Sequence, residues 1–317
     1  MAVRRAPPDH METTPRPRAS RLEQALRAHR FAITAEITPP VSCNAQDLLE
    51  KALPLRGLVD AVNVTDGASA RAHMSAPIAA VMLAQAGLEP ILQLTCRDRN
   101  RLALEGELMG AAASGVQNLL CLTGDDPKAG DQPETKAVFD IDSVTLTRIA
   151  RDLRDKGVLP SGRAVAGTAH FFIGAADVPF DPPPGWQPQK LAAKVAAGAQ
   201  FAQTQFCMDR GIVHRYAARL KENEALRDFF LLVGIAPLRS AKSARWMQKH
   251  LFGTIIPESI VQRLEQSADP AAQGERICVE LIEELAAIPA VAGVHVMAPA
   301  NDAALPRVIA EARRRLG

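Results

Sequence analysis

Short apolar runs that end in a polar residue recur along the chain. In the stretch 118–127, NLLCLTGDDP, an apolar run too short for a helix stops at Thr-Gly, and Asp125 and Asp126 follow. Such a run is typical of a buried parallel strand with a polar loop after it. The polar residues that follow the first four runs are spaced at 29 or 30 residues, about one strand and one helix each: Glu36, Thr65, Thr95 and Asp125.

Eight such runs occur, with segments long enough for a helix between them. The predicted strands lie at 31–36, 61–65, 91–95, 119–122, within 164–174, and at 201–206, 229–235 and 293–298. This alternation predicts an α/β fold, a (β/α)8 TIM barrel, with an extra helical insertion at 257–288 before the last strand. The active site of such a barrel lies where the strands end. The polar residues that end the strands should therefore meet in one cavity.

Length and composition bound the remaining possibilities. The 317 residues fit a single barrel domain at 21–317, with a short helix from Leu22 across its bottom, after a disordered tail at 1–20 that lacks the apolar segment of a signal peptide. A net charge of +2 and 4% aromatic residues give no case for nucleic acid. No apolar run approaches the ~20 residues of a membrane span. Five cysteines without a CxxC pair favour the reducing cytoplasm. We expect a homo-oligomer.

Four residues are candidates for chemistry. Glu36 is followed by two prolines that restrict the backbone, and a rigid, buried carboxyl group suits a general acid because loss of solvent favours its neutral form. Asp125 can stabilise a cationic intermediate, and the amide of Gln205 can recognise a heterocycle. Lys194 can reach a phosphate. Each side chain can instead be structural: the first three can cap or satisfy a strand end, and the lysine can lie on a solvated helix face.

Several common functional motifs are absent. The sequence contains no GxGxxG, GxxxxGK[ST] or HExxH motif and no His/Cys cluster with metal-ligand spacing. A Rossmann dinucleotide site, P-loop phosphotransfer and zinc hydrolysis are therefore disfavoured, and no metal site is expected. The facing of His295 on the last predicted strand stays open. The residues alone predict a barrel with an acid-lined cavity and leave its ligand open.

Seven segments resemble the methylenetetrahydrofolate reductase family, in the family's order and spacing. They are AEITPP, NVTDGASARAHMS, LQLTCRDRN, LLCLTGDDP, KVAAGAQFAQTQFCMD, GIAPLRS and GVHVMA, which together span nearly all of 31–301. The resemblance implies an FAD-containing oxidoreductase of one-carbon metabolism that reduces the folate 5,10-methylenetetrahydrofolate to 5-methyltetrahydrofolate, as in methionine biosynthesis. NAD(P)H is the implied electron donor, and it reduces the flavin before folate binds in a ping-pong cycle.

The resemblance also implies roles for individual residues. Glu36 matches the general acid that assists opening of the methylene bridge to a reactive iminium, and Asp125 matches the aspartate beside flavin and folate. Gln205 matches the glutamine that contacts the pterin, and Asn301 is expected to bind substrate. The implied cofactor-binding positions are Thr65, Asp66, Ala68, Gln93, Thr123, Gly124, Asp125, Gly174, Ala175, Ala176 and Lys194.

The sequence departs from the family pattern at a few positions. Ile37-Thr38 replaces aromatic residues after the glutamate, Gln93 stands where many members have histidine, and Ala241 stands where some have phenylalanine. The loop 96–100, CRDRN, resembles a branch in which some members take electrons through a partner protein. Two alternative functions stay open. The same site could oxidise 5-methyltetrahydrofolate in a demethylation pathway, or the chain could be a folate-binding, partner-dependent subunit without independent flavin chemistry.

Overall fold

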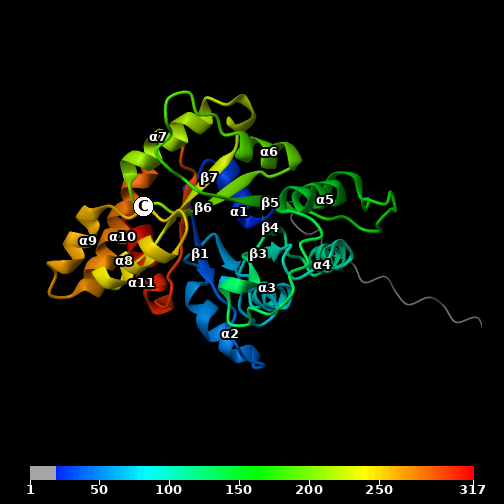
Figure 1. The fold of residues 1–317 in the computed structure, drawn as a ribbon, viewed down its shortest axis with the longest axis horizontal. Coiled ribbons are helices and arrows are strands. Elements are labelled where there is room, and N and C mark those ends of the chain that lie inside the picture. Colours follow the sequence, from blue (N-terminus) through cyan, green and yellow to red (C-terminus); the bar gives the residue numbers. More distant parts are fainter. Residues whose placement is uncertain (1–18) are drawn as a thin grey trace, which may run out of the picture.

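The computed structural model describes residues 19–317. Eight parallel strands form a closed barrel in sequence order, and the last strand pairs with the first. Helices surround the strands on all sides in Figure 1. This architecture confirms the predicted (β/α)8 barrel, including the extra helices before the last strand.

The elements alternate along the chain. The strands are β1 (Ala32–Ile37), β2 (Ala61–Val64), β3 (Pro90–Thr95), β4 (Asn118–Leu122), β5 (Phe172–Asp177), β6 (Phe201–Phe206), β7 (Phe230–Ile235) and β8 (Gly293–Val296). The helices are α1 (Arg21–Arg27), α2 (Ala45–Ala52), α3 (Ala76–Gln85), α4 (Arg101–Ala113), α5 (Ser143–Lys156), α6 (Gln189–Ala197), α7 (Arg210–Lys221), α8 (Ala241–His250), α9 (Glu258–Glu265), α10 (Pro270–Ala286) and α11 (Leu305–Leu316).

The fifth strand begins within its predicted range and extends beyond it. The strand was placed within 164–174, but β5 begins at Phe172 and continues to Asp177. The reason is its pairing with the next strand, because Ala175 to Asp177 remain in register with Ala202 to Thr204 of β6. Asp177 therefore belongs to the sheet.

Helix α1 closes the bottom of the barrel, as predicted. Ser20 is buried and caps this helix, since its hydroxyl accepts from the Glu23 amide and donates to Asn118 Oδ1 of β4 at 2.6 Å. Leu22 and Leu26 pack against apolar residues of the strands inside the barrel. Of the predicted tail, Ala19 and Ser20 are described, and residues 1–18 lie outside the described part of the chain.

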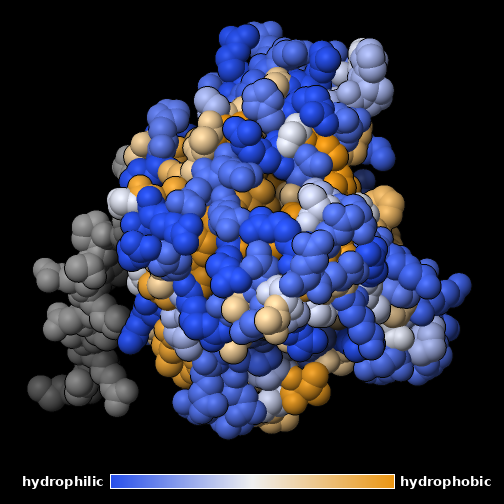
Figure 2. Space-filling model, turned by 90° about the vertical axis from the view of Figure 1, so that its left-hand side faces the viewer, coloured by the Kyte–Doolittle hydropathy of each residue, from blue (hydrophilic) through white to orange (hydrophobic). Residues whose placement is uncertain are grey.

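Helix α5 shows why the outer helices form where they do. Asp142 caps its first turn by accepting from the Thr145 amide, and Gly157 ends it with a left-handed φ of 63°. Its buried residues recur at helical spacing and face the barrel: Leu146, Thr147, Ile149, Ala150 and Leu153. Within residues 19–317 no helix is long and apolar enough to cross a membrane. On the face drawn in Figure 2, hydrophobic residues appear as separate spots in a mainly hydrophilic surface.

The inside of the barrel changes from apolar to polar toward the strand ends. Alternate residues of a strand share one face, so β1 directs Ala32, Thr34 and Glu36 inward. The bottom layer joins inward apolar side chains to α1 in one cluster. The layer above it is polar, built from Thr34, Asn63, Gln203 and His295, all buried. A cavity lies above that layer.

Candidate active site

The cavity lies at the carboxyl ends of the strands and has a volume of about 680 Å³. Ends of β1, β2, β3, β4 and β6 contribute to it, as does the segment after β8. Nine of the predicted site residues line it: Glu36, Thr65, Asp66, Ala68, Gln93, Thr123, Gly124, Asp125 and Gln205. The structure therefore brings together residues that are up to 169 positions apart in the sequence.

Glu36 lies at the floor of the cavity, with 24% of its side chain exposed. Gln93 Nε2 donates to Glu36 Oε2 at 3.0 Å, and His295 Nε2 lies 3.5 Å from the same oxygen. No hydrogen bond to Glu36 Oε1 is found in the described part of the chain. One carboxyl oxygen is therefore held by side chains from β3 and β8, while the other is available to a ligand.

The polar layer beneath Glu36 holds His295 in place. The Nδ1 atom of His295 lies 3.0 Å from Thr34 Oγ1 and 3.3 Å from Gln203 Nε2. The amides of Gln203 and Asn63 bind each other in both directions. Because these groups are buried and hydrogen-bonded, they fix the orientation of the imidazole.

Asp66 lines the cavity, but its carboxylate is bound by protein groups. Arg99 forms a two-point ion pair with it, at 2.7 Å to Oδ2 and 2.9 Å to Oδ1. The amide and hydroxyl of Thr95 donate to Asp66 Oδ2 at 2.8 and 2.9 Å. With 6% of its side chain exposed, Asp66 joins the loops after β2 and β3.

Two glycines, one in the loop after β2 and one in the loop after β4, pack against Arg97 in the loop after β3. A Cβ on Gly124, where φ is +95°, would lie 2.9 Å from Arg97 Cβ and 3.1 Å from Thr95 Cβ. A Cβ on Gly67, where φ is +62°, would lie 2.2 Å from Arg97 Nη2. Arg97 itself is buried and donates to Gly67 O and to Asp98. Only glycine allows the two loops to pack this closely around the arginine.

Thr65 has a polar atom without a partner. The residue is 5% exposed, and its hydroxyl Oγ1 forms no hydrogen bond with residues 19–317. A buried hydroxyl without a partner is costly unless a ligand supplies one. Since Thr65 lines the cavity, its hydroxyl fits a role in binding a polar group there.

Five predicted site residues do not line the cavity. Gly174 faces the barrel interior below it, where a Cβ would lie 2.4 Å from the Phe201 ring. Ala175 is buried in the apolar cluster between strands and helices, and Ala176 offers its carbonyl oxygen to Lys194 Nζ at 2.5 Å. The fourth is Lys194 itself. The fifth, Asn301, donates from Nδ2 to the carbonyl oxygen of Pro237 at 3.0 Å, although its neighbours along the chain line the cavity.

A buried ionisable cluster surrounds the end of β5. The Tyr216 hydroxyl donates to Asp177 Oδ2 at 2.6 Å, and Lys194 lies nearby on α6. Burial raises the pKa of Asp177, while Tyr216 and Lys194 oppose that shift. Burial also lowers the pKa of Lys194, against the attraction of Asp177. The lysine predicted to bind the cofactor is therefore engaged with the end of β5.

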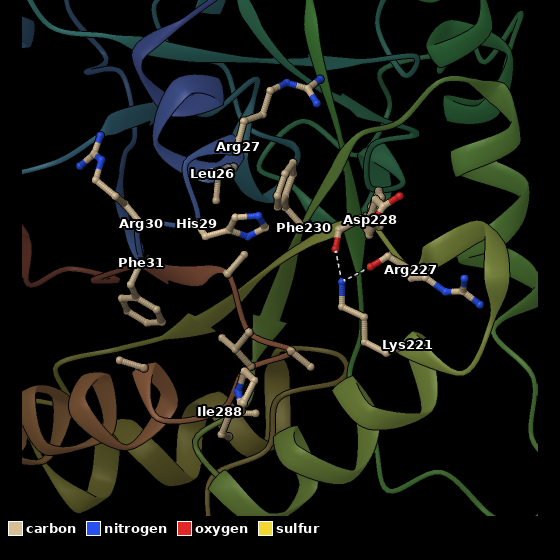
Figure 3. Close-up of a pocket in the computed structure, with 16 residues that line it drawn as sticks. Leu26, Arg27, His29, Arg30, Phe31, Lys221, Arg227, Asp228, Phe230 and Ile288 are labelled. Carbon is tan, nitrogen blue, oxygen red and sulfur yellow. Dashed lines mark hydrogen bonds between the residues drawn. The ribbon is translucent and has the colours of Figure 1, made fainter.

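A second cavity, of about 460 Å³, lies at the other end of the barrel. Figure 3 shows the side chains of Arg27, Arg30 and Arg227 extending away from its centre. Lys221 Nζ donates to the carbonyl oxygens of Arg227 at 2.6 Å and Phe229 at 3.0 Å. None of the predicted site residues lines this cavity. Its arginine side chains extend outward and its lysine binds backbone carbonyls, so the cavity at the strand ends is the better candidate for the active site.

The matches to known proteins agree with this geometry. The family model described as methylenetetrahydrofolate reductase matches residues 21–313. The chain belongs to the methylenetetrahydrofolate reductase family. This confirms the resemblance that the seven segments indicated.

Members of the family with similar sequences include two longer eukaryotic proteins. Methylenetetrahydrofolate reductase 2 of Schizosaccharomyces pombe is 26% identical over 227 residues, which are 69% of this chain and 34% of that protein. A probable methylenetetrahydrofolate reductase (NADPH) of Caenorhabditis elegans is 27% identical over 219 residues, 67% of this chain and 30% of that protein. The chain spans about a third of the length of these relatives.

Solved structures share the barrel. An uncharacterised protein from Clostridium thermocellum, described as binding two copies of 5-methyl-5,6,7,8-tetrahydrofolic acid, has a TM-score of 0.63 at 14% identity and covers 93% of this chain and 98% of its own. EDTA monooxygenase (EmoA) from Chelativorans sp. BNC1 has a TM-score of 0.52 at 13% identity, with 90% and 93% covered. At such identities the likeness shows the fold alone.

Sequence reasoning missed the layer that supports Glu36. Thr34, Asn63, Gln203 and His295 were not predicted as site residues, although all four lie directly below the cavity. A signal was available, because three of them stand two positions before a polar residue that was predicted to end a strand or line the site. Alternation along a strand places such pairs on the same inward face.

Proposed function

We propose that the chain is a flavin-dependent methylenetetrahydrofolate reductase, which reduces 5,10-methylenetetrahydrofolate to 5-methyltetrahydrofolate in a ping-pong cycle. One observation carries the proposal. Glu36 lies at the floor of the cavity with one oxygen held by Gln93 and His295 and the other available to a ligand. A carboxyl group fixed in this way suits proton transfer to a bound substrate.

The cavity at the carboxyl ends of the strands fits a flavin, which we propose is FAD. The unpartnered hydroxyl of Thr65 offers a hydrogen bond, and the small side chain of Ala68 leaves space for a flat ring. Gln93, Thr123 and Asp125 complete the proposed binding surface. A bound flavin would supply hydride-transfer chemistry in the cavity.

The remaining roles concern the folate. Glu36 gives a proton to the amine nitrogen of the methylene bridge, which takes the electron pair of the breaking C–N bond and leaves an iminium. The exposed carboxylate of Asp125 stabilises that positive charge. Gln205 Oε1 accepts from the Phe206 amide at 3.0 Å, so the Gln205 NH2 group remains to bind the pterin.

The electron donor and the assembly are further proposals. We propose NAD(P)H as the donor, supported by the name of the Caenorhabditis elegans relative, which specifies NADPH. The CRDRN loop, 96–100, supports an electron-transfer protein as the alternative donor. We also propose that residues 21–317 act as one catalytic domain, because every named strand of the described chain belongs to one barrel. A homo-oligomer is a separate proposal.

Absorbance spectroscopy of the purified protein tests this function. We expect a flavin band that bleaches when NADH, NADPH or reduced ferredoxin is added without oxygen, and that returns when 5,10-methylenetetrahydrofolate follows. Bleaching by 5-methyltetrahydrofolate instead of these donors would favour the oxidative direction. A colourless protein that binds 5-methyltetrahydrofolate and does not take up added FAD would contradict the proposal and support a folate-binding subunit.

A further inference from the structure

The amide of Gln203 pairs with the amide of Asn63 on β2. One of its two N–H groups donates to Asn63 Oδ1 at 2.9 Å, and Asn63 returns a hydrogen bond to Gln203 Oε1. The second N–H of Gln203 points between Thr34 Oγ1 at 3.1 Å and His295 Nδ1 at 3.3 Å. The side that Gln203 presents to the imidazole is therefore a donor.

This arrangement selects one tautomer of His295. An amide N–H cannot accept a hydrogen bond, and a proton on Nδ1 would face it directly at 3.3 Å. The Thr34 hydroxyl donates to the Val294 carbonyl at 3.2 Å and lies 3.0 Å from Nδ1, so the Gln203 N–H is the donor that faces Nδ1. The neutral imidazole is therefore expected to carry its proton on Nε2, on the side of Glu36.

The proton on Nε2 determines how the carboxyl group of Glu36 is used. Nε2 lies 3.5 Å from Glu36 Oε2, and Gln93 Nε2 donates to the same oxygen at 3.0 Å. Because the lone pairs of Oε2 already accept from these two donors, a proton of the carboxyl group itself would compete with them for the same positions. The ionisable proton of Glu36 then belongs on Oε1, which has no hydrogen-bond partner in the described chain.

We propose that Gln203 sets the tautomer of His295 and thereby assigns the transferable proton of Glu36 to Oε1. Gln203 and His295 are positioning residues in this account, since they act through Glu36. The consequence for catalysis rests on the proposed function, in which Oε1 gives that proton to the amine nitrogen of the methylene bridge. The tautomer itself does not depend on any reaction.

Nitrogen-15 NMR of the imidazole rings tests the tautomer directly. The protein holds seven histidines, and loss of one signal pair in a His295→Gln variant assigns His295. We expect Nδ1 to resonate in the range of an unprotonated, pyridine-type nitrogen and Nε2 in that of a protonated one. A protonated Nδ1 in the wild-type protein would overturn the proposal.

Two substitutions separate the effect of Gln203 from that of its neighbours. In Gln203→Glu a carboxylate faces Nδ1 and can only accept, so Nδ1 should gain a proton. In Thr34→Val the amide donor remains, so Nδ1 should stay unprotonated. The exposed His214 in the same spectra is the internal control, and its signals should not move. An unchanged Nδ1 in Gln203→Glu would contradict the proposal. If that variant does not fold, Gln203→Met, which removes the donor at similar size, should convert Nδ1 to a mixture of both forms.

Kinetics then show whether the tautomer matters. We expect Gln203→Glu to slow reoxidation of the reduced enzyme by 5,10-methylenetetrahydrofolate by about 10-fold or more and to leave reduction by the donor unchanged. If the wild-type protein shows the expected tautomer but no flavin activity, the proposed function is refuted and the assignment of the tautomer stands. A switched tautomer with unchanged folate kinetics would refute the assignment of the proton to Oε1.

Discussion

Asp66 shows that a carboxylate at the cavity can be fully engaged by the protein. Its two oxygens are bound by Arg99 and by the backbone and hydroxyl of Thr95. The position was predicted to bind the cofactor, and the structure shows it joining the loops that shape the cavity. Its contribution to a bound flavin would then come through the shape of the wall.

Asp66→Asn tests this structural role. The substitution removes the carboxylate that binds the partly buried Arg99 guanidinium at two points and leaves it only Glu107 at 4.0 Å. We therefore expect the free energy of unfolding of the flavin-free protein to fall by about 2–4 kcal/mol. Equilibrium urea denaturation measures it. Asp181→Asn is the control, because Asp181 pairs with Arg215 at an exposed position and should matter far less. Equal effects of the two substitutions would contradict the assignment.

Asp177 predicts a pH dependence of stability. Burial raises its pKa above the ordinary value of 3.8, so the protonated form is favoured more in the folded protein than in the unfolded chain. The stability from this group is complete below the unfolded pKa and is lost as pH rises through the folded pKa. Asp177→Asn should therefore gain stability relative to wild type as pH rises from about 4 toward neutrality. Thermal unfolding across this range measures the difference, and a constant difference would argue against a raised pKa.

Strand β5 explains why part of the predicted cofactor site lies elsewhere. Gly174 and Ala175 occupy alternate faces, one packed on Phe201 inside the barrel and one in the outer apolar cluster. The run of small residues in the sequence did not indicate that the Phe201 ring packs against Gly174. A proline-rich loop, 178–186, follows β5. It is held by Trp186, whose ring centroid lies 5.4 Å from that of Tyr216.

Gly174→Ala separates packing from cofactor binding. The added Cβ would lie 2.4 Å from the Phe201 ring, so we expect a loss of about 1–3 kcal/mol in the free energy of unfolding. Flavin content per folded molecule should be unchanged, because the glycine does not line the cavity. Denaturation and absorbance of the same sample measure both quantities. Loss of flavin without loss of stability would restore Gly174 to the cofactor site.

The closed barrel explains what could be predicted from the sequence and what could not. A spacing of 29 or 30 residues between polar strand ends fits one strand and one helix, so the fold and the cavity residues at those ends followed from it. The supporting layer joins residues that are far apart in the chain. Asn63 and Gln203 are separated by 140 positions, and Thr34 and His295 by 261. No local pattern contains such contacts, because closure of the barrel creates them.

The two half-reactions of a Glu36→Gln variant test the central claim most directly. The variant keeps the shape of the side chain and loses the acid, and Glu50→Gln on the exposed face of α2 is the matched control. Anaerobic stopped-flow absorbance should show flavin reduction by the donor close to the wild-type rate and reoxidation by 5,10-methylenetetrahydrofolate slowed by about 10²-fold or more. Equal loss of both half-reactions, or wild-type reoxidation, would contradict the role of Glu36 as the general acid.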